Sequence, residues 1–205
     1  MVISGNFNTT SKEIKIVESL LIQAGIEYEY VKKSINQDDE DILVKLQNEI
    51  VVNTIEVKEE SLARIKKYND LGIDYLSAFY FINPRDEYIW KGAPKKPHQI
   101  DEFESKINIV KPGKIYYSKA AIWLFYATDG DEIFFADWFL GKDMTSDVFI
   151  EYLRNNCLFA VNNKPATQLS HRDNHQSATF FINRDDPILM QLKQSIYSIF
   201  DYENN

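Results

Sequence analysis

The segment DILVKLQNEIVVNTIEVK, residues 41–58, predicts two β-strands joined at Asn48-Glu49. A two-residue turn there sets a register that runs back to Asp41 opposite Glu56. Directly paired residues share one face of a sheet, so this register separates an apolar face from a polar one. A turn of odd length would flip one strand and mix the two sets. We therefore expect a hairpin with this register.

The two faces of the hairpin differ in the chemistry they offer. On one face we expect Ile42, Val44, Leu46, Val51, Ile55 and Val57. On the other we expect Asp41, Lys45, Gln47, Thr54, Glu56 and Lys58, with Leu43 and Val52 as apolar exceptions. Asn53 is the polar exception on the apolar face.

The polar face predicts a cation site. Asp41 and Glu56 would have Cβ atoms about 5 Å apart, and like charges directly opposite each other are destabilising. A divalent cation would turn that cost into binding, because Mg²⁺ takes one or two carboxylates together with water and substrate phosphate. Lys58 could orient a nucleophilic water or stabilise developing negative charge, as in metal-assisted phosphodiester hydrolysis.

The surrounding patterns predict the order αβββαβ. An apolar stripe at helical spacing gives a helix over about residues 11–24, followed by an alternating strand at 26–31. After the hairpin we expect a helix at about 60–71. The continuous apolar run at 73–82 then predicts a strand buried on both faces.

Asp41-Ile42, followed about fifteen residues later by Ile55-Glu56-Val57-Lys58 within this order, resembles the PD-(D/E)xK nuclease superfamily. That superfamily includes restriction endonucleases and Holliday-junction resolvases. The resemblance implies an α/β fold with a restriction-endonuclease-like αβββαβ core, in which helices flank a mixed central sheet. It also implies Asp41 and Glu56 as Mg²⁺ ligands and Lys58 as the catalytic lysine. The Val57 carbonyl is implied as a third ligand, and Glu18 of the first helix as a further one.

Three features differ from the superfamily's pattern or weaken its specificity. The proline that often precedes the first acid is absent, because residue 40 is Glu. Asp39 is an alternative first ligand if the strand starts earlier. Glu-x-Lys also occurs at 13–15 and 104–106, but only the copy at 56–58 ends a hairpin strand with an acid opposite it.

The remainder of the chain predicts an α+β extension. Residues 83–114 hold four of the six prolines, and a hairpin is expected around the turn at 128–131. Two more helices are expected, one at about 146–156 and one that starts with Asp186 as N-cap. We expect one domain over 1–205, with a nuclease-like core at 1–90. Residues 91–205 would serve DNA recognition, dimerisation or both, in a homodimer.

Charge and composition limit the choice of partners. The formal net charge is −8, so a broad basic footprint for nucleic acid or anionic lipid is not expected. Locally basic segments remain as candidate DNA contacts, namely Arg64, Lys66 and Lys67 after the hairpin and Lys91, Lys95 and Lys96 within 85–119. The sequence shows no glycine-rich phosphate loop, so a nucleotide cofactor is not expected.

The chain's single cysteine excludes a disulfide framework and fits a reducing cytoplasm. We see no signal peptide and no apolar stretch of the roughly 18 residues needed to span a membrane. A cytoplasmic protein with no membrane partner is therefore expected.

Two further segments have chemical interpretations. The stretch His171-Arg172-Asp173-Asn174-His175 has metal-like His spacing, but its polar surroundings favour a solvated loop, which could contact DNA bases. The aromatic segment Tyr116–Phe139 could stack on single strands, although its acidic residues favour buried strands or a dimer face.

These observations predict a Mg²⁺-dependent DNA endonuclease, with a type II restriction enzyme as one form of it. A non-catalytic acidic interaction protein, such as an immunity or anti-defence factor, is the main alternative and follows from the net charge. A third option keeps the nuclease fold as a DNA-binding scaffold without catalysis.

Overall fold

The computed structural model describes residues 12–34, 42–163 and 176–201, and the chain divides into two compact units. Unit 1 is formed from residues up to 59, 119–140 and 194 onward, and unit 2 from 60–118 and 141–193. The chain therefore passes between the units four times, and the boundary expected at residue 90 is not where the compact units divide.

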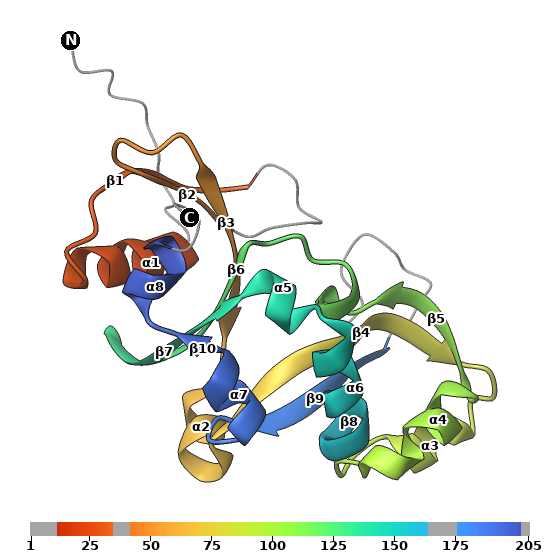
Figure 1. Cartoon of the computed structure of the whole chain (residues 1–205). Coiled ribbons are helices and arrows are strands. Elements are labelled where there is room, and N and C mark those ends of the chain that lie inside the picture. The colour runs from red at the N-terminus through yellow and green to blue at the C-terminus, as the bar shows by residue number, and fades with distance from the viewer. Residues whose placement is uncertain (1–11, 35–41, 164–175, 202–205) are drawn as a thin grey trace. The chain divides into compact units, whose positions relative to one another are not determined.

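Unit 1 is built on a six-stranded mixed sheet with the order β1-β2-β3-β6-β7-β10 (Figure 1). Its strands are β1 (Tyr28–Lys33), β2 (Ile42–Leu46), β3 (Val52–Glu59), β6 (Ile122–Asp129), β7 (Glu132–Leu140) and β10 (Lys193–Gln194). The first three strands form an antiparallel meander, β6 runs parallel to β3, and β7 returns antiparallel to β6. The mixed α/β class expected from the sequence is confirmed.

Two helices, α1 (Lys12–Gln23) and α8 (Ile196–Asp201), lie side by side over one face of this sheet (Figure 1). Val17 and Leu21 of α1 pack there with the apolar hairpin face. The helix ends at Gly25, whose φ of 68° is accessible to glycine without strain, and the Ile26 N–H donates to the Leu21 carbonyl at 2.9 Å.

The strand predicted at 73–82 does not belong to the sheet of the hairpin. That stretch belongs to β4 (Asp70–Phe81) in the sheet of unit 2, and the parallel neighbour of β3 is β6. Every residue from Ile122 to Ala127 is buried, so β6 is the strand with both faces covered. β4 alternates more, as expected for a strand in an antiparallel sheet with one buried face.

Unit 2 is built on a four-stranded antiparallel sheet with the order β5-β4-β9-β8. Its other strands are β5 (Ile107–Pro112), β8 (Leu158–Asn163) and β9 (Gln176–Asn183). Lys95 covers part of the outer edge of β8 by exchanging two backbone hydrogen bonds with Phe159, at 2.6 and 3.1 Å.

Short helices surround this second sheet. They are α2 (Leu62–Tyr68), α3 (Asp86–Trp90), α4 (Ile100–Glu104), α5 (Gly141–Met144), α6 (Asp147–Asn156), α7 (Pro187–Leu192) and the 3₁₀ turns η1 (Pro97–Gln99) and η2 (Lys114–Tyr116). The predicted N-cap of α7 is confirmed, because Asp186 accepts from the Ile188 N–H at 3.0 Å. α2 ends earlier than predicted, since Asn69 already takes the left-handed conformation at φ 52°.

Cys157 is buried at the end of α6, and its thiol is expected to be unreactive in the native protein. Burial, helped by the negative charge of Asp186, raises the pKa of the thiol to about 12. Between about pH 9 and pH 12 the native thiol stays protonated while the unfolded thiol is ionised. The contribution of this thiol to the free energy of unfolding is therefore fully present below about pH 9 and is lost as the pH rises toward 12. Thiol labelling at ~pH 8 should be at least about 100-fold slower in the native protein than in urea. Equal rates in both states would contradict the buried position.

Among the described helices, none has the length and apolar composition that a membrane crossing requires.

Candidate active site

The β2–β3 hairpin has the register that the sequence predicts. Ile42 pairs with Ile55, and Lys45 pairs with Val52. The turn contains Asn48 in the left-handed conformation, with φ 65°. Asp41 and its alternative Asp39 lie outside the described residues.

Glu56 lies on the face of β3 that points away from α1 and α8, since its neighbours Ile55 and Val57 are in the core beneath those helices. Only 1% of Glu56 is exposed. Lys58, on the same face, is partly buried. A carboxylate removed from water in this way is stable only with hydrogen bonds, a cation or a metal as compensation.

The residues beside Glu56 and Lys58 come from β6 and β7. In the parallel register Glu56 lies next to Trp123 and Lys58 next to Phe125, and β7 places Asp137 beyond Phe125. Asp137 is only 3% exposed, so a second buried carboxylate shares this face. Two strand spacings separate the Cα atoms of Lys58 and Asp137 by about 10 Å, a gap that a lysine side chain can partly cross.

Trp123 adds a hydrogen-bond donor to the same face. Its indole N–H is buried and has no hydrogen-bond partner among the described residues. Unsatisfied buried donors are uncommon in native proteins, and a ligand oxygen is one way of satisfying them. The sequence patterns did not predict that Trp123 and Asp137 share this face. The available signal was the break that Asp137 makes in the aromatic pattern of EIFFADWFL.

Glu18 is not brought to Glu56. It lies on α1, on the opposite side of the sheet, and accepts a hydrogen bond from the Tyr28 hydroxyl. Burial and this carboxylate raise the pKa of Tyr28. The Val57 side chain belongs to the core on that same side, and its backbone lies in the part of β3 paired with β6.

The described part of the chain contains no group of three His, Cys, Asp or Glu side chains able to hold a metal ion. Carboxylates are the oxygen ligands that Mg²⁺ prefers, and one or two of them suffice when water and substrate phosphate complete the coordination. The carboxylates that the structure describes on this face include those of Glu56 and Asp137.

The predicted DNA contacts of α2 lie in unit 2, and two of them meet aromatic rings. The Arg64 guanidinium lies over the Phe181 ring, with its carbon 3.4 Å from the ring centre, and its Nε donates to Asp70 at 2.7 Å. Lys67 lies 4.8 Å from the ring centre of Tyr68, and Lys66 is exposed.

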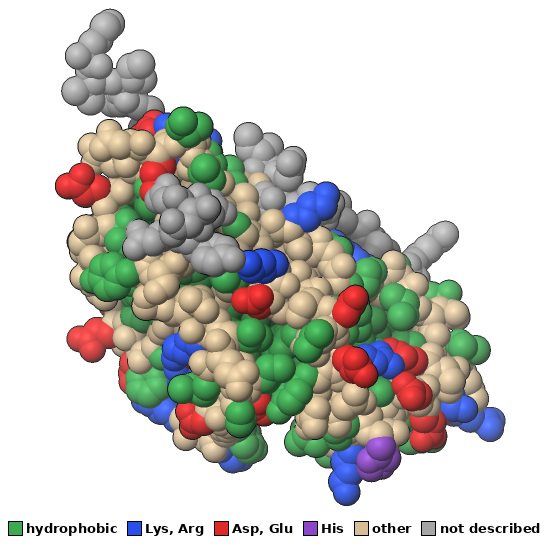
Figure 2. Space-filling model, viewed as in Figure 1, with side chains coloured by type: hydrophobic (Ala, Val, Ile, Leu, Met, Phe, Trp, Pro, Cys, Tyr) green, Lys and Arg blue, Asp and Glu red, His purple; other side chains and the backbone are tan. Residues whose placement is uncertain are grey.

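The second predicted group lies near the edge of β8. Lys91 forms an ion pair with Glu87, and the Lys95 ammonium donates to the Ile89 carbonyl at 2.9 Å. The Lys96 N–H donates to the Gln99 side chain at the start of η1. On the face drawn in Figure 2, acidic and basic side chains are interspersed among hydrophobic ones, with no continuous basic surface over the described residues.

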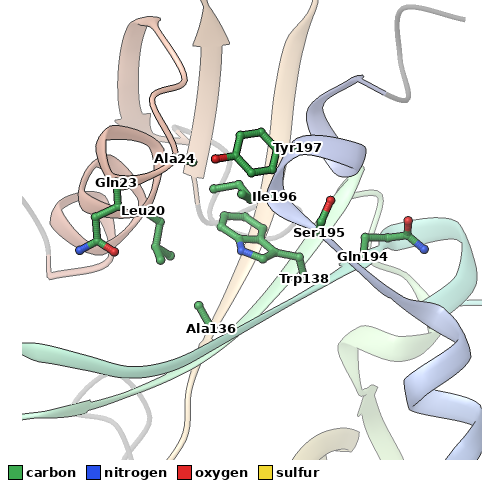
Figure 3. Close-up of a pocket in the computed structure, with 9 residues that line it drawn as sticks. All are labelled: Leu20, Gln23, Ala24, Ala136, Trp138, Gln194, Ser195, Ile196 and Tyr197. Carbon is green, nitrogen blue, oxygen red and sulfur yellow. The ribbon is translucent and has the colours of Figure 1, made fainter.

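A shallow hollow of about 330 Å³ lies on the other side of the unit 1 sheet (Figure 3). It is lined by Leu20, Gln23, Ala24, Ala136, Trp138, Gln194, Ser195, Ile196 and Tyr197. Trp138 and Ile196 lie next to each other, with Leu20 of α1 across from them. Its lining contains no carboxylate, lysine, arginine or histidine, and Tyr197 is its one titratable side chain.

Of the two further segments with a chemical interpretation, the structure describes the aromatic segment Tyr116–Phe139. The stretch 171–175 lies outside the described residues. In the aromatic segment, Trp123, Phe125 and Tyr126 are fully buried, which confirms buried strands and leaves those rings unable to stack on a nucleic acid.

Comparisons with protein-family models, with curated proteins and with solved structures find no match to this chain.

Proposed function

We propose that this protein is a Mg²⁺-dependent endonuclease that hydrolyses DNA at the polar face of β3. The observation that carries the proposal is the carboxylate of Glu56, which shares with Lys58 the face of β3 opposite the cluster packed by α1 and α8. The hairpin register, continued one pair beyond Ile42 and Ile55, would set Asp41 opposite that carboxylate.

The topology of unit 1 supports the proposal. The PD-(D/E)xK resemblance implies a mixed central sheet after a first helix, and unit 1 has the order α1-β1-β2-β3 followed in the sheet by the parallel strand β6. The connection from β3 to β6 contains the whole first segment of unit 2, residues 60–118, instead of a single crossover helix.

Each residue has a distinct role in this proposal. The carboxylates of Glu56 and Asp41 would hold Mg²⁺, which when bound supplies Lewis-acid polarisation of a phosphate oxygen and an activated water. The Lys58 ammonium would orient that water or donate to a non-bridging oxygen as negative charge develops.

The test is cleavage of plasmid and linear DNA by the purified chain in Mg²⁺ and in EDTA. Lys58→Ala should lower the cleavage rate about 100- to 1,000-fold, because a preorganised charge at the developing anion is lost. Lys45→Ala is the matched control, since Lys45 lies on the same face of the hairpin but pairs with Glu29 at the surface. It should leave the rate unchanged.

Cleavage that survives in EDTA, or equally in Lys58→Ala, would contradict the proposal. Absence of cleavage on several DNAs, with no effect of Mg²⁺ on the melting temperature, would favour the acidic interaction protein that the net charge of −8 allows.

A further inference from the structure

Unit 2 contains a hollow of about 430 Å³ beside α2, here called the α2 hollow. It is lined by Arg64 and Tyr68 of α2, Asp70 at the start of β4, Leu158 and Ala160 of β8, Phe181 of β9, and Pro94. This volume lies within the roughly 300–1,000 Å³ typical of small-ligand sites.

The floor of the α2 hollow is an apolar patch on one face of the unit 2 sheet. Leu158 pairs directly with Phe181, and Gly72 of β4 lies on the other side of Phe181. These positions alternate with Phe159 and Phe180, which point into the aromatic core on the opposite face. Leu158 remains 45% exposed and Tyr68 56% exposed, so apolar surface is open at this place.

Arg64 is held in a fixed orientation at the wall. Its guanidinium stacks on Phe181, and its Nε donates to Asp70 Oδ1 at 2.7 Å. The two Nη groups have no hydrogen-bond partner among the described residues, and neither has Asp70 Oδ2. An arginine fixed by stacking and by one carboxylate loses little further freedom when its fork binds a ligand.

The charges of the α2 hollow favour a neutral ligand. Arg64 and Asp70 form an ion pair, so the wall carries donors and an acceptor side by side with little net charge. Phosphate or carboxylate would meet the Asp70 carboxylate as well as the arginine. A flat ring with an acceptor next to N–H donors on one edge would offer the acceptor to the Arg64 guanidinium and the donors to the Asp70 carboxylate. The faces of such a ring would pack on the apolar floor.

We propose that the α2 hollow binds an unpaired guanine base of a nucleic-acid strand. Guanine presents its O6 acceptor beside the N1–H and N2–H₂ donors, which complement the Arg64 fork and the Asp70 carboxylate. Tyr68 supplies an aromatic face for stacking. The exposed Lys66 and Lys67 of α2 would meet the adjoining phosphates. The nucleic-acid source of the base rests on the function proposed above.

The test is fluorescence anisotropy of a short labelled oligothymidylate, with or without one central guanine, added to the full chain in EDTA. We expect the guanine strand to bind about 10-fold more tightly, the discrimination typical of one well-formed base contact. Arg64→Ala should remove this preference. Arg85→Ala, which removes the same charge from an exposed position in unit 2, should retain it.

Leu158→Trp is the second variant, because it fills the α2 hollow without changing any charge and also tests the proposal if Arg64→Ala folds poorly. It should remove the guanine preference as well. Equal affinity for both strands, or a preference that survives in Leu158→Trp, would overturn the inference. Guanosine monophosphate that competes as well as the strand would overturn the strand as the source of the base.

Binding is measured in EDTA, where Mg²⁺-dependent hydrolysis is not expected. The result therefore does not depend on whether the cleavage proposal is correct. Guanine-dependent binding without cleavage in Mg²⁺ would contradict only the proposed hydrolysis. Cleavage without guanine-dependent binding would contradict only the role of the α2 hollow.

Discussion

Replacement of Glu56 by glutamine is expected to lower DNA cleavage in Mg²⁺ by at least about 100-fold, because a ligand should matter more than the outer-shell partners whose loss costs about 10- to 100-fold. The side chain is nearly isosteric, so the change isolates the charge of a carboxylate that is only 1% exposed. Mg²⁺ should also raise the melting temperature of the wild-type chain and leave that of Glu56→Gln unchanged. A ligand at about 100 times its dissociation constant stabilises the native state by about 2.7 kcal/mol, which calorimetry resolves readily.

Glu59→Gln is the matched control for this experiment. Glu59 lies three residues along the same strand, is half-exposed and pairs with Lys12 at the surface. Its loss should cost at most about 1 kcal/mol and leave cleavage intact. The opposite result would be a Glu56→Gln chain that cleaves normally in Mg²⁺ but loses about 3–5 kcal/mol of stability in EDTA. That outcome would identify Glu56 as half of a structural ion pair.

Replacement of Phe103 by alanine should have the largest effect on stability, about 3–5 kcal/mol. Its ring is fully buried in unit 2, with ring centres of Phe79, Trp90 and Phe159 each 5.3 Å away. Loss of the ring removes several aromatic contacts at once and leaves a cavity. Urea denaturation measures the change in the free energy of unfolding.

Tyr88→Ala provides the comparison, because this neighbouring aromatic residue is 88% exposed and its loss should change stability by less than about 0.5 kcal/mol. Trp90 lies in unit 2, whereas Trp123 and Trp138 lie in unit 1. Fluorescence and circular dichroism transitions that separate in Phe103→Ala would show that the units unfold independently. An effect of Phe103→Ala no larger than that of Tyr88→Ala would contradict the packing described for this core.

The local structure of the hairpin could be predicted because a strand shows its faces in every second residue. Ile42, Val44, Ile55 and Val57 had to share a side, and only one register of the turn allowed it. The neighbour of β3 could not be predicted in this way. Two long apolar runs, near 73–82 and 119–127, were both suitable, and periodicity does not indicate which one pairs across a long connection.

The candidate site was predictable in the same limited sense. Glu56 and Lys58 were placed on one face by alternation alone, and their position is as expected. Trp123 and Asp137 join them only through the pairing of β3 with β6 and of β6 with β7, which no local pattern contains. Glu18 was assigned from the resemblance, and it lies on the opposite side because the stripe of α1 that packs on the sheet covers the hairpin's apolar face.

The parallel pairing of β3 with β6 also affects how the chain can be synthesised and folded. All of residues 60–121 must leave the ribosome before β6 can pair with β3. Until then, the edge of β3 in the nascent meander of β1, β2 and β3 has no strand partner. Closing so long a loop is entropically costly and slow, and it becomes easier if the intervening residues have already collapsed and brought its ends together. Yet unit 2 is itself incomplete until residues 141–193 emerge. Each unit is thus completed only by a segment of its own that follows part of the other unit along the chain, which favours folding after release from the ribosome over folding in the order of synthesis.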